Sequence, residues 1–565
     1  MVRVADYIAD FIYKQGVRHV FMLSGGGSIF LDDGLAKHRY LKEVAVRNEA
    51  AAPMMAEAYA RLNRNLGVVY VTTGPGGTNA VSGLAESWVD SAPILIVSGQ
   101  VKRRHTTHKL RLKPRTFGTQ ELDIISVVKP ITKYAVMVDS PENIRYHLEK
   151  AVYLARSGRP GPVWLDIPLD VQSSTINENK LKGFVIPKNS SNRRLLKRQF
   201  NKVIGLLKCS KSPLIIAGQG IRISKAVSEF KDLIERVNLP VITSRLGQDL
   251  LPYSHGNNFG HGGVKGSRFS GFIMKSADLV ICLGSRLSVS FTGENFDVFN
   301  HDAKVVMVDI DKAELEKPGL KIDLKIRSDA KYFIGELKTR INKKRLPDYS
   351  AWLKVCRQYK EEHPLINSTY KRNPINLYYF ISRLDALSNN KHIFVSDAGS
   401  SYYVTGQALR FEKGQREITS GAFASMGLSI PLAIGASFAE EDAQILAVTG
   451  DGSLELNIQE LKTMSFYNLN IKLFVINNGG YVSIRNTQDI LCSGRYINSD
   501  QRNCNDVLNF QKVADAFGLP YCLIEKYEEV DSKIKKIIAK TGPAFVEVCC
   551  DNKQKIIDSP KVLPS

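Results

Sequence analysis

The sequence predicts an α/β protein with three doubly wound parallel-sheet domains, of which the first and third are related units. A chain of 565 residues is too long for a single hydrophobic core, and three domains are the natural division. Short apolar runs typical of buried strands alternate with helical patterns, which favours parallel sheets covered on both faces. Residues 161–167 (GPVWLDI) resemble residues 542–548 (GPAFVEV), which indicates an internal repeat.

The first domain is expected over residues 1–172. Helices are predicted at 4–13 and at 49–61, the latter with small residues on its packing face. Four short apolar runs predict buried strands, at 20–23, 44–46, 68–71 and 95–97. Residues 173–194 are rich in Ser, Asn and Lys and have no apolar period, so they predict a linker.

The second domain is expected over 195–341 and the third over 375–553, with another linker at about 342–374. In the second domain, apolar runs predict strands from Leu214, at 279–283 and at 305–308. In the third domain, strands at 445–449 and 471–476 are joined by one amphipathic helix. Residues 68–76 resemble residues 446–452, so the repeat places glycine-rich turns of the first and third domains at equivalent strand ends.

The net charge of +21 has two interpretations. It could mark a nucleic-acid or membrane-surface binder, or a lysine-rich surface facing phosphorylated ligands. Most of the basic residues are dispersed, which favours the second interpretation. Residues 4–13 do not have the pattern of a signal peptide, and no apolar run is long enough to span a bilayer. The eight cysteines include no C-x-x-C pair, so we expect a cytoplasmic protein with reduced thiols. From the dispersed charge and the lack of a long apolar run, we expect binding to neither nucleic acid nor membrane.

One stretch of the third domain carries a pattern suited to a metal-bound diphosphate. Gly450-Asp451-Gly452-Ser453 follows the strand at 445–449, and Asn477-Asn478 follows the next strand. A glycine-rich turn at the carboxyl end of a strand presents backbone N–H groups at a helix N-terminus, where a diphosphate binds well. Asp451 and Asn478 are 27 residues apart, at the carboxyl ends of adjacent strands. Their oxygen atoms, with diphosphate oxygens and water, suit octahedral Mg²⁺.

This GDGS…NN pattern is the thiamine-diphosphate signature, and the whole chain resembles the acetolactate synthase branch of that superfamily. The resemblance implies thiamine diphosphate as cofactor, with Mg²⁺ held by Asp451, the Asn478 side chain and the Gly480 carbonyl. It also implies that the first domain of one subunit and the third domain of another share each cofactor, so a homodimer is the minimum active unit and a homotetramer is common. The cofactor contacts expected in the third domain are Gly399, Ser400, Ala424, Met426, Gly450, Gly452, Ser453, Gly480 and Tyr481.

Four residues match positions that bear on the chemistry of this family. Glu49 lies in VRNEAAAPMMAEAYAR, and the resemblance implies that it bonds the aminopyrimidine ring and promotes its imino tautomer. The alternative is a glutamate favoured by a helix dipole. Met426 matches the large apolar residue that props the cofactor into a bent form, although a methionine can also be core filler. Ala424 would offer its carbonyl to the cofactor amine, and Gln120 matches a residue on the acceptor side.

The second domain resembles the flavin-binding domain of acetolactate synthases. Matching positions are Gly218 and Gly220 in the turn after the strand from Leu214, Arg286 in GSRLS and Asp309 in VDID. The resemblance implies FAD in a structural role without redox duty. Related decarboxylases keep this domain but bind an adenine nucleotide or nothing, which is the alternative.

The acceptor side departs from the family pattern. Thr119 and Thr487 replace two aromatic residues of the family, and Asn48 and Ser401 stand where the family has histidine. Loss of two large side chains should enlarge the acceptor pocket. The loop at 101–120 could grip a phosphorylated acceptor, or it could be a solvated surface loop. Its basic residues are Lys102, Arg103, Arg104, Lys109, Arg111, Lys113 and Arg115.

We therefore expect a thiamine-diphosphate-dependent carboligase that decarboxylates pyruvate, a 2-oxo acid, and transfers the two-carbon unit to a carbonyl acceptor. A second pyruvate or 2-oxobutyrate as acceptor would make it an acetolactate synthase of branched-chain amino-acid synthesis. The altered pocket keeps open a nucleotide-linked keto-sugar acceptor, as in surface-polysaccharide pathways. A simple 2-oxo acid decarboxylase is a third alternative.

Overall fold

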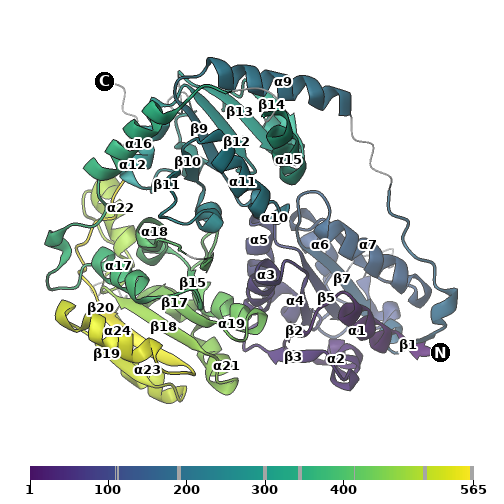
Figure 1. Ribbon diagram of the computed structural model, residues 1–565. Coiled ribbons are helices and arrows are strands. Elements are labelled where there is room, and N and C mark those ends of the chain that lie inside the picture. Colours follow the sequence, from purple (N-terminus) through teal and green to yellow (C-terminus); the bar gives the residue numbers. More distant parts are fainter. Residues whose placement is uncertain are drawn as a thin grey trace.

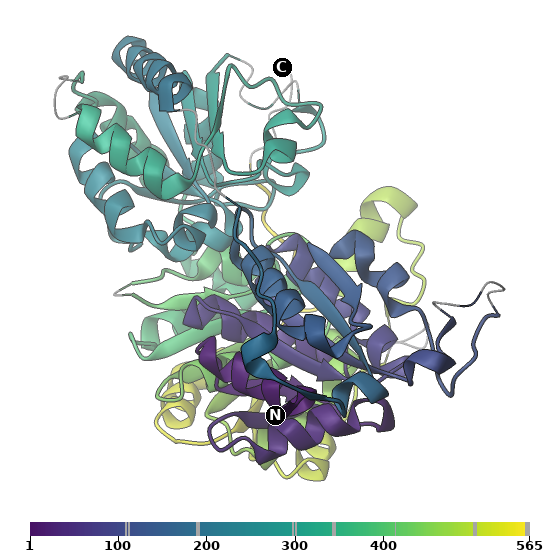
Figure 2. The same cartoon turned by 90° about the vertical axis from the view of Figure 1, so that its right-hand side faces the viewer.

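The structure, a computed structural model, describes residues 1–107, 110, 114–187, 193–296, 299, 302–341, 346–412, 414–500 and 506–559. Within them, three six-stranded sheets form three α/β domains. Figure 1 shows the first domain in purple and blue, the central domain in teal at the top and the third in green and yellow. In the view of Figure 2 the central domain again stands above the other two.

The first and third sheets have the same strand order, whereas the central sheet differs. In chain order the strands of the first and third sheets are arranged 2-1-3-4-6-5, and those of the central sheet 3-2-1-4-5-6. All neighbouring strands in these three sheets are parallel. The predicted fold class and the internal repeat are therefore confirmed, because β4 and β17, and likewise β7 and β20, occupy equivalent places.

Apart from the helix expected between the strands at 445–449 and 471–476, the predicted strands and helices agree with the structure to within three residues at each end. The first domain contains β1 (Val2–Arg3), α1 (Val4–Lys14), β2 (His19–Met22), α2 (Ile29–Lys37), β3 (Lys42–Ala45), α3 (Ala51–Asn63), β4 (Gly67–Val71), α4 (Pro75–Asn79), α5 (Val81–Val89), β5 (Ile94–Gln100), α6 (Ile124–Val128), β6 (Tyr134–Met137), α7 (Ile144–Arg156), β7 (Val163–Pro168), α8 (Leu169–Gln172) and β8 (Thr175–Ile176). Strands β2, β4, β5 and β7 are buried along their whole length, which explains their unbroken apolar runs.

The central domain contains α9 (Arg193–Cys209), β9 (Pro213–Ala217), α10 (Gly220–Ile223), α11 (Val227–Val237), β10 (Val241–Thr243), the 3₁₀ helix η7 (Arg245–Leu250), β11 (Asn258–His261), α12 (Arg268–Ser276), β12 (Leu279–Leu283), α13 (Val289–Thr292), β13 (Lys304–Asp309), α14 (Lys312–Glu316), β14 (Leu324–Arg327) and α15 (Ala330–Ile341). Helix α16 (Ser350–Glu362) lies within the segment expected to be a linker at about 342–374. Its buried Trp352 donates a hydrogen bond to the carbonyl of Pro213, so this part of the linker is packed onto the central domain.

The third domain contains α17 (Leu377–Leu387), β15 (His392–Ser396), α18 (Gly399–Ala408), β16 (Arg416–Ile418), α19 (Ser429–Ala439), β17 (Gln444–Gly450), α20 (Asp451–Leu454), η10 (Glu455–Glu460), α21 (Leu461–Phe466), β18 (Ile471–Asn477), α22 (Val482–Cys492), α23 (Phe510–Ala516), β19 (Tyr521–Ile524), α24 (Val530–Ile538) and β20 (Ala544–Cys549). The prediction of one helix between β17 and β18 was wrong. The segment is α20, η10 and α21, and Asn457 interrupts it with non-helical φ and ψ. The Asn457 amide instead donates to the carbonyl of Gly427, and asparagine side chains commonly compete in this way with helical bonding.

Helices α3 and α19 join the first and third domains through one continuous apolar core. A Cβ atom placed on Gly435 would lie 2.1 Å from the carbonyl oxygen of Met55, so the two backbones are in direct contact. The small residues of α3 allow this approach, as its sequence predicts. The interface positions the segment before α3 relative to the third domain.

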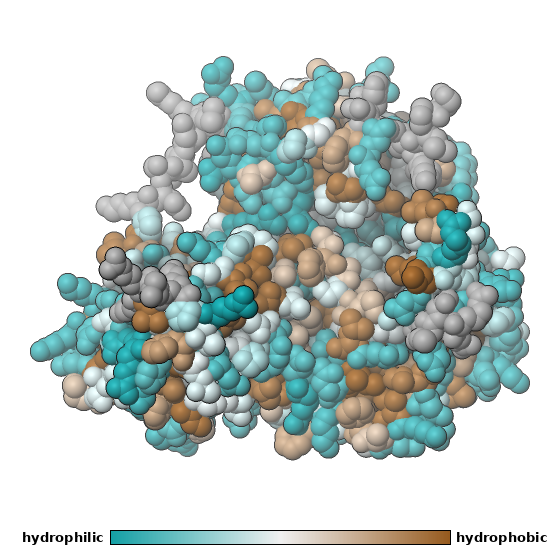
Figure 3. All heavy atoms as spheres, turned by 180° about the vertical axis from the view of Figure 1, so that it is seen from behind, coloured by the Kyte–Doolittle hydropathy of each residue, from teal (hydrophilic) through white to brown (hydrophobic). Residues whose placement is uncertain are grey.

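Apolar side chains remain exposed on the surface of these two domains. Figure 3 shows several hydrophobic patches between hydrophilic areas on the lower half of the molecule. Among the described residues, no helix combines the length and apolar character needed to cross a bilayer.

Candidate active site

Three helices of the third domain begin at neighbouring strand ends on one edge of the sheet. Helices α18, α20 and α22 follow β15, β17 and β18, which are adjacent in the sheet. Gly399 opens α18 with φ +60°, a conformation that favours glycine. A Cβ atom placed on Gly399 would lie 3.9 Å from that of Ser483, so the starts of α18 and α22 face each other. Their unpaired N–H groups can bind an anion, and Ser400 lies in the same first turn.

Asp451 is the buried acid at this edge. Its carboxylate accepts hydrogen bonds from the backbone N–H groups of Gly452 (2.8 Å), Asn478 (2.9 Å) and Gly480 (3.0 Å). The predicted proximity of Asp451 and Asn478 is thus present. Burial raises the pKa of Asp451, and the three N–H donors act in the opposite direction.

The residues at this edge fit Mg²⁺ by the chemistry of their donors. A carboxylate, an amide oxygen and a backbone carbonyl are the hard ligands that Mg²⁺ takes, and phosphate oxygens and water usually complete its coordination. A divalent cation would also offset the cost of the buried Asp451 carboxylate. Asn478 is itself buried, and Gly480 has φ +98°. The described residues contain no cluster of three or more His, Cys, Asp and Glu that could hold a metal.

Tyr481 and Ser453 close this edge of the sheet. A Cβ atom on Gly452 would lie 2.1 Å from the Tyr481 ring, so any side chain after Asp451 would displace that ring. The Ser453 hydroxyl donates to Asp397 (2.6 Å) and accepts from the Gly427 N–H (2.8 Å). Ser453 could therefore contact a diphosphate through its backbone N–H, because its hydroxyl is engaged elsewhere. Gly450, the last residue of β17, brings this turn to the sheet edge.

The loop at 420–427, which we call the cofactor loop, carries Ala424 and Met426. Ala424 has φ +52°, a rare conformation for a residue with a side chain. Its N–H is held by the Ser420 hydroxyl at 2.7 Å. The loop ends at Gly427, which is bonded to Ser453, and so lies directly beside the glycine-rich turn of Asp451. Met426 is half-buried there.

Glu49 and Gln120 flank one glycine-rich turn of the first domain. Glu49 is 7% exposed, accepts a hydrogen bond from the Asn79 amide at 3.0 Å, and has Oε1 3.4 Å from a Cβ placed on Gly76. A Cβ on Gly74 would lie 2.1 Å from the carbonyl oxygen of Gln120. The shielded carboxyl group expected at Glu49 is therefore present, and the structure brings Gln120 to the same turn.

A cavity of about 1080 Å³, which we call the central cavity, is lined mostly by the central domain and also by residues of the other two, such as Asp90 and Gly421. Gly220, Arg286 and Asp309 line it, as the flavin resemblance implies. Gly218 does not line the cavity, because it packs on the facing turn: its Cβ would lie 2.1 Å from the carbonyl oxygen of Gly284. The cavity is large enough for a dinucleotide, and its basic residues suit a diphosphate, so the residues present fit FAD.

Three residues expected on the acceptor side lie at the surface of the chain, whereas a fourth, Ser401, is buried. Thr119 and Gln120 are exposed, and the exposed Thr487 donates its hydroxyl to the Ser483 carbonyl of its own helix. Ser401 turns inward and donates to Asp397 at 3.0 Å. Lys109, Arg111 and Lys113 of the basic loop lie outside the described residues.

Several contacts that hold these segments are not marked by any sequence motif. Glu460 holds the segment before Glu49, and Arg245 of the central domain reaches the strand before the cofactor loop. Both residues act across domains. Neither Arg245, in SRLGQDLL, nor Glu460, in NIQELKTM, stands in an apolar run, so no local signal in the sequence marks them as buried.

A glycine-rich turn with a buried aspartate between helix starts, placed on paired α/β domains, defines an enzyme that binds a metal-bound diphosphate cofactor. Comparison with known proteins identifies the cofactor. Residues 2–127, 200–337 and 397–548 match the N-terminal TPP binding, central and C-terminal TPP binding domains of thiamine pyrophosphate enzymes.

Similar proteins extend this finding over nearly the whole chain. The acetolactate synthase large subunit of Lactococcus lactis is 32% identical over 559 residues, which cover 98% of this chain and 93% of the relative. That of Buchnera aphidicola subsp. Schizaphis graminum is 31% identical over 562 residues, covering 98% and 95%. Chloroplastic acetolactate synthase 1 of Nicotiana tabacum is 29% identical over 567 residues, covering 98% and 82%. The chain therefore belongs to the thiamine pyrophosphate enzymes, in the branch of the acetolactate synthase large subunits.

Proposed function

We propose that this enzyme decarboxylates pyruvate and transfers the two-carbon unit to a second 2-oxo acid, pyruvate or 2-oxobutyrate. The observation that carries the proposal is the set of Asp451, the cofactor loop and Glu49 on domains that match those of thiamine pyrophosphate enzymes. When bound, thiamine diphosphate would supply a nucleophilic ring carbon for the 2-oxo acid and a cationic ring that takes up the electron pair left by CO₂.

The residues of the chain would bind and orient the cofactor and the substrates, and would shield them from water. Asp451, Asn478 and the Gly480 carbonyl would hold Mg²⁺, and the starts of α18 and α22 would bind the diphosphate. Met426 would support the bent cofactor, and the Ala424 carbonyl would accept a hydrogen bond from its amine. Glu49 would share a proton with the aminopyrimidine, because its carboxyl group is shielded from water. Gln120 would face the acceptor.

We further propose a homodimer or homotetramer, in which the first domain of one subunit completes the site of another. Apolar side chains beside the cofactor residues support this, because three of them are about half exposed in the single chain: Phe423 (50%), Leu456 (52%) and Ile484 (50%). FAD is proposed for the central cavity, with a structural role.

One observation favours a second candidate, in which the acceptor is larger and anionic. A second cavity of about 750 Å³ is lined by Gly26, Asp170 and three consecutive basic residues, Lys102, Arg103 and Arg104. Arg103 is paired with Asp170 at 2.7 Å, whereas neither Lys102 nor Arg104 forms an ion pair with a carboxylate within the described part of the chain. Their charges could bind a phosphorylated acceptor such as a nucleotide-linked keto-sugar.

Mass spectrometry of the product formed from pyruvate alone tests the proposal. Acetolactate is expected if the acceptor is a second pyruvate, and acetaldehyde as sole product would instead indicate a simple decarboxylase. The Glu49→Gln variant should bind cofactor normally but slow exchange of the cofactor's reactive ring proton, followed by NMR. An unchanged exchange rate would remove Glu49 from the proposed chemistry.

A further inference from the structure

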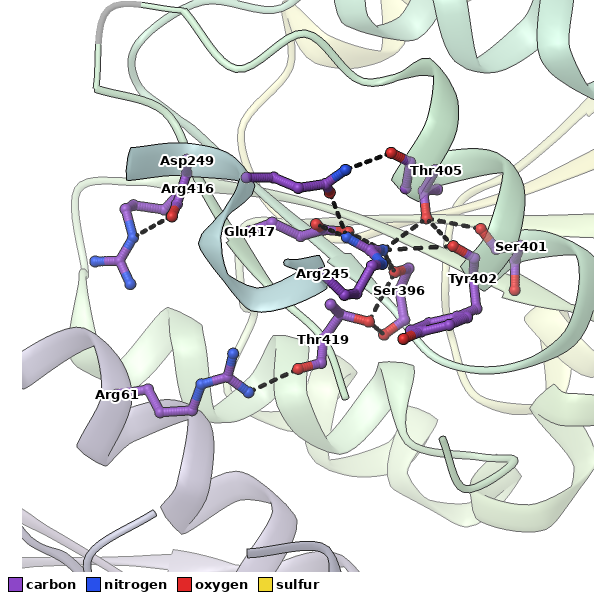
Figure 4. Close-up of polar contacts among 12 residues, drawn as sticks. Arg61, Arg245, Asp249, Ser396, Ser401, Tyr402, Thr405, Arg416, Glu417 and Thr419 are labelled. Atoms are coloured by element: carbon purple, nitrogen blue, oxygen red, sulfur yellow. Dashed lines mark hydrogen bonds and ion pairs between the residues drawn. The ribbon is translucent and has the colours of Figure 1, made fainter. Parts of the chain in front are cut away.

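The cofactor loop is preceded by a strand that a buried arginine of the central domain holds in place. Arg245 begins η7 and reaches into the third domain, where its guanidinium forms a two-point ion pair with Glu417 of β16. The side chains of Arg245 and Glu417 are only 6% and 4% exposed. Figure 4 shows Arg245 enclosed by residues of β15, β16 and α18.

Further contacts fix the orientation of Arg245. Its Nη2 donates to the hydroxyls of Ser396 (3.2 Å) and Thr405 (3.3 Å), and its guanidinium carbon lies 4.8 Å from the centre of the Tyr402 ring. Planar guanidinium groups suit such a combination of forked and stacked contacts, whereas lysine does not. A buried pair of this kind adds little net stability compared with apolar residues, but it imposes one geometry on its surroundings.

The geometry passes from this pair to the start of the cofactor loop. The Ser396 hydroxyl bridges Glu417 (3.1 Å) and the Thr419 hydroxyl (2.9 Å), which itself bonds the Ser396 carbonyl. On the other side, Arg61 of the first domain donates to the Thr419 carbonyl at 2.7 Å, as Figure 4 shows. Thr419 immediately precedes the cofactor loop and is therefore held from all three domains.

Residues of the other two domains also hold the loop itself. The N–H of Gly421 donates to Asp90 of the first domain at 2.7 Å, and the Ser425 hydroxyl donates to Glu86 at 2.7 Å. A Cβ atom on Gly421 would lie 2.6 Å from Leu246, the neighbour of Arg245. The central cavity is lined by some of the same residues, namely Asp90, Arg245, Leu246 and Gly421. Residues that hold the cofactor loop therefore also form part of the cavity wall.

We infer that Arg245 is a positioning residue for thiamine diphosphate: with Glu417 it sets the cofactor loop in the conformation that presents Ala424 and Met426. The inference rests on the proposed role of that loop. The pair transmits the position of the central domain to the thiamine site, although no atom of Arg245 belongs to that site.

The test measures two quantities for each variant. Titration calorimetry gives the affinity for thiamine diphosphate in the presence of Mg²⁺, and thermal unfolding gives the melting temperature. Arg245→Met should weaken binding about tenfold and lower the melting temperature, because it leaves the Glu417 carboxylate buried and unpaired. The double variant Arg245→Met/Glu417→Leu removes both charges while filling the space. It should regain stability but keep the weakened binding, because the geometry set by the pair is still absent.

Asp249→Asn is the matched control. Asp249 forms buried ion pairs at 2.7 Å with Arg222 of its own domain and with Arg416 of β16, but it makes no contact with Ser396 or Thr419 among the described contacts. This variant should bind the cofactor within twofold of the unaltered protein.

Met426→Ala separates the inference from the proposed function. If Met426→Ala weakens binding and Arg245→Met does not, Arg245 has no positioning role and the inference is overturned. The same holds if the double variant regains both stability and binding, since the pair then only stabilises the fold. If Met426→Ala binds normally, the proposed role of the cofactor loop fails, and the inference fails with it.

Discussion

Glu460 of the third domain accepts hydrogen bonds from the backbone N–H groups of Arg47 (2.7 Å) and Asn48 (3.0 Å), just before Glu49. Glu460 is fully buried, and its other oxygen accepts from the Thr463 hydroxyl at 2.8 Å. The segment that presents Glu49 is thus fixed by a side chain 412 residues away from Asn48. The segment before Glu49 is therefore bound to the third domain of the same chain, the domain proposed to bind the diphosphate.

Glu460→Ala should slow exchange of the cofactor's reactive ring proton about tenfold, measured by NMR on the assembled enzyme. The change leaves two partly buried N–H groups without their acceptor, which costs at most about 1–3 kcal/mol each and favours displacement of the segment. Tyr467→Phe is the matched control, because its hydroxyl accepts from the Ala45 N–H in the same interface. Equal exchange rates in both variants would contradict a positioning role for Glu460.

Asp451→Asn should abolish the Mg²⁺ dependence of thiamine diphosphate binding. The neutral amide cannot offset the charge of the cation, and cofactor affinity should fall about a hundredfold. Titration calorimetry with and without Mg²⁺ measures both effects. Glu455→Gln, which changes a nearby acid of η10, should retain the dependence. Affinity and Mg²⁺ dependence like those of the unaltered protein would argue against Asp451 as a ligand.

The proximity of Asp451 and Asn478 could be predicted from the sequence. The contacts that Glu460 and Arg245 make with other domains could not. Two buried strands joined by a helical segment are parallel, so residues after their carboxyl ends meet at one edge. No such rule links Arg245 with Glu417, 172 residues apart, because their contact depends on how two domains dock. The interruption at Asn457 was also missed, since it depends on the carbonyl of Gly427, 30 residues away in the same domain.

The purified protein should be yellow if FAD occupies the central cavity. Arg286→Ser should then reduce the flavin recovered by acid extraction about tenfold, since Arg286 is one of the basic residues lining the cavity. Lys304→Ser, an exposed position on the same domain, serves as the control. A colourless preparation with full activity would remove FAD from the account.

A buried acidic cluster between the first and third domains should make stability depend on pH. It consists of Glu57, Glu86 and Asp90. Burial, and then the neighbouring Asp90, raise the pKa of Glu57 to about 8, against the attraction of Arg61 at 3.0 Å. Because the folded-state pKa lies above the unfolded value, Glu57 is tolerated in its neutral form at low pH. Stability is therefore lost as pH rises from about 4.5 through 8.

Glu57→Gln should flatten the fall in melting temperature between about pH 6 and pH 8, the upper part of that range. The amide can keep a hydrogen bond with Ser87, whose hydroxyl donates to Glu57 at 3.1 Å. Glu528→Gln, at an exposed position, should leave the pH profile unchanged. If Glu57→Gln and the unaltered protein lose stability in parallel, ionisation of Glu57 is not the cause.

The basic residues at the second cavity separate the two candidate acceptors. Lys102 and Arg104 have no carboxylate partner among the described residues, while Arg103 is held by Asp170 and by the Asp139 carbonyl. Changing Lys102 and Arg104 to Ser should raise KM about tenfold or more for a nucleotide-linked keto-sugar, because charge-assisted hydrogen bonds to its phosphates are lost. Formation of acetolactate from pyruvate should be little affected, since pyruvate carries no phosphate. Arg115→Ser, at an exposed loop position that does not line this cavity, is the control. If the unaltered enzyme uses no phosphorylated acceptor, and the double variant makes acetolactate at the full rate, this part of the loop is a solvated surface.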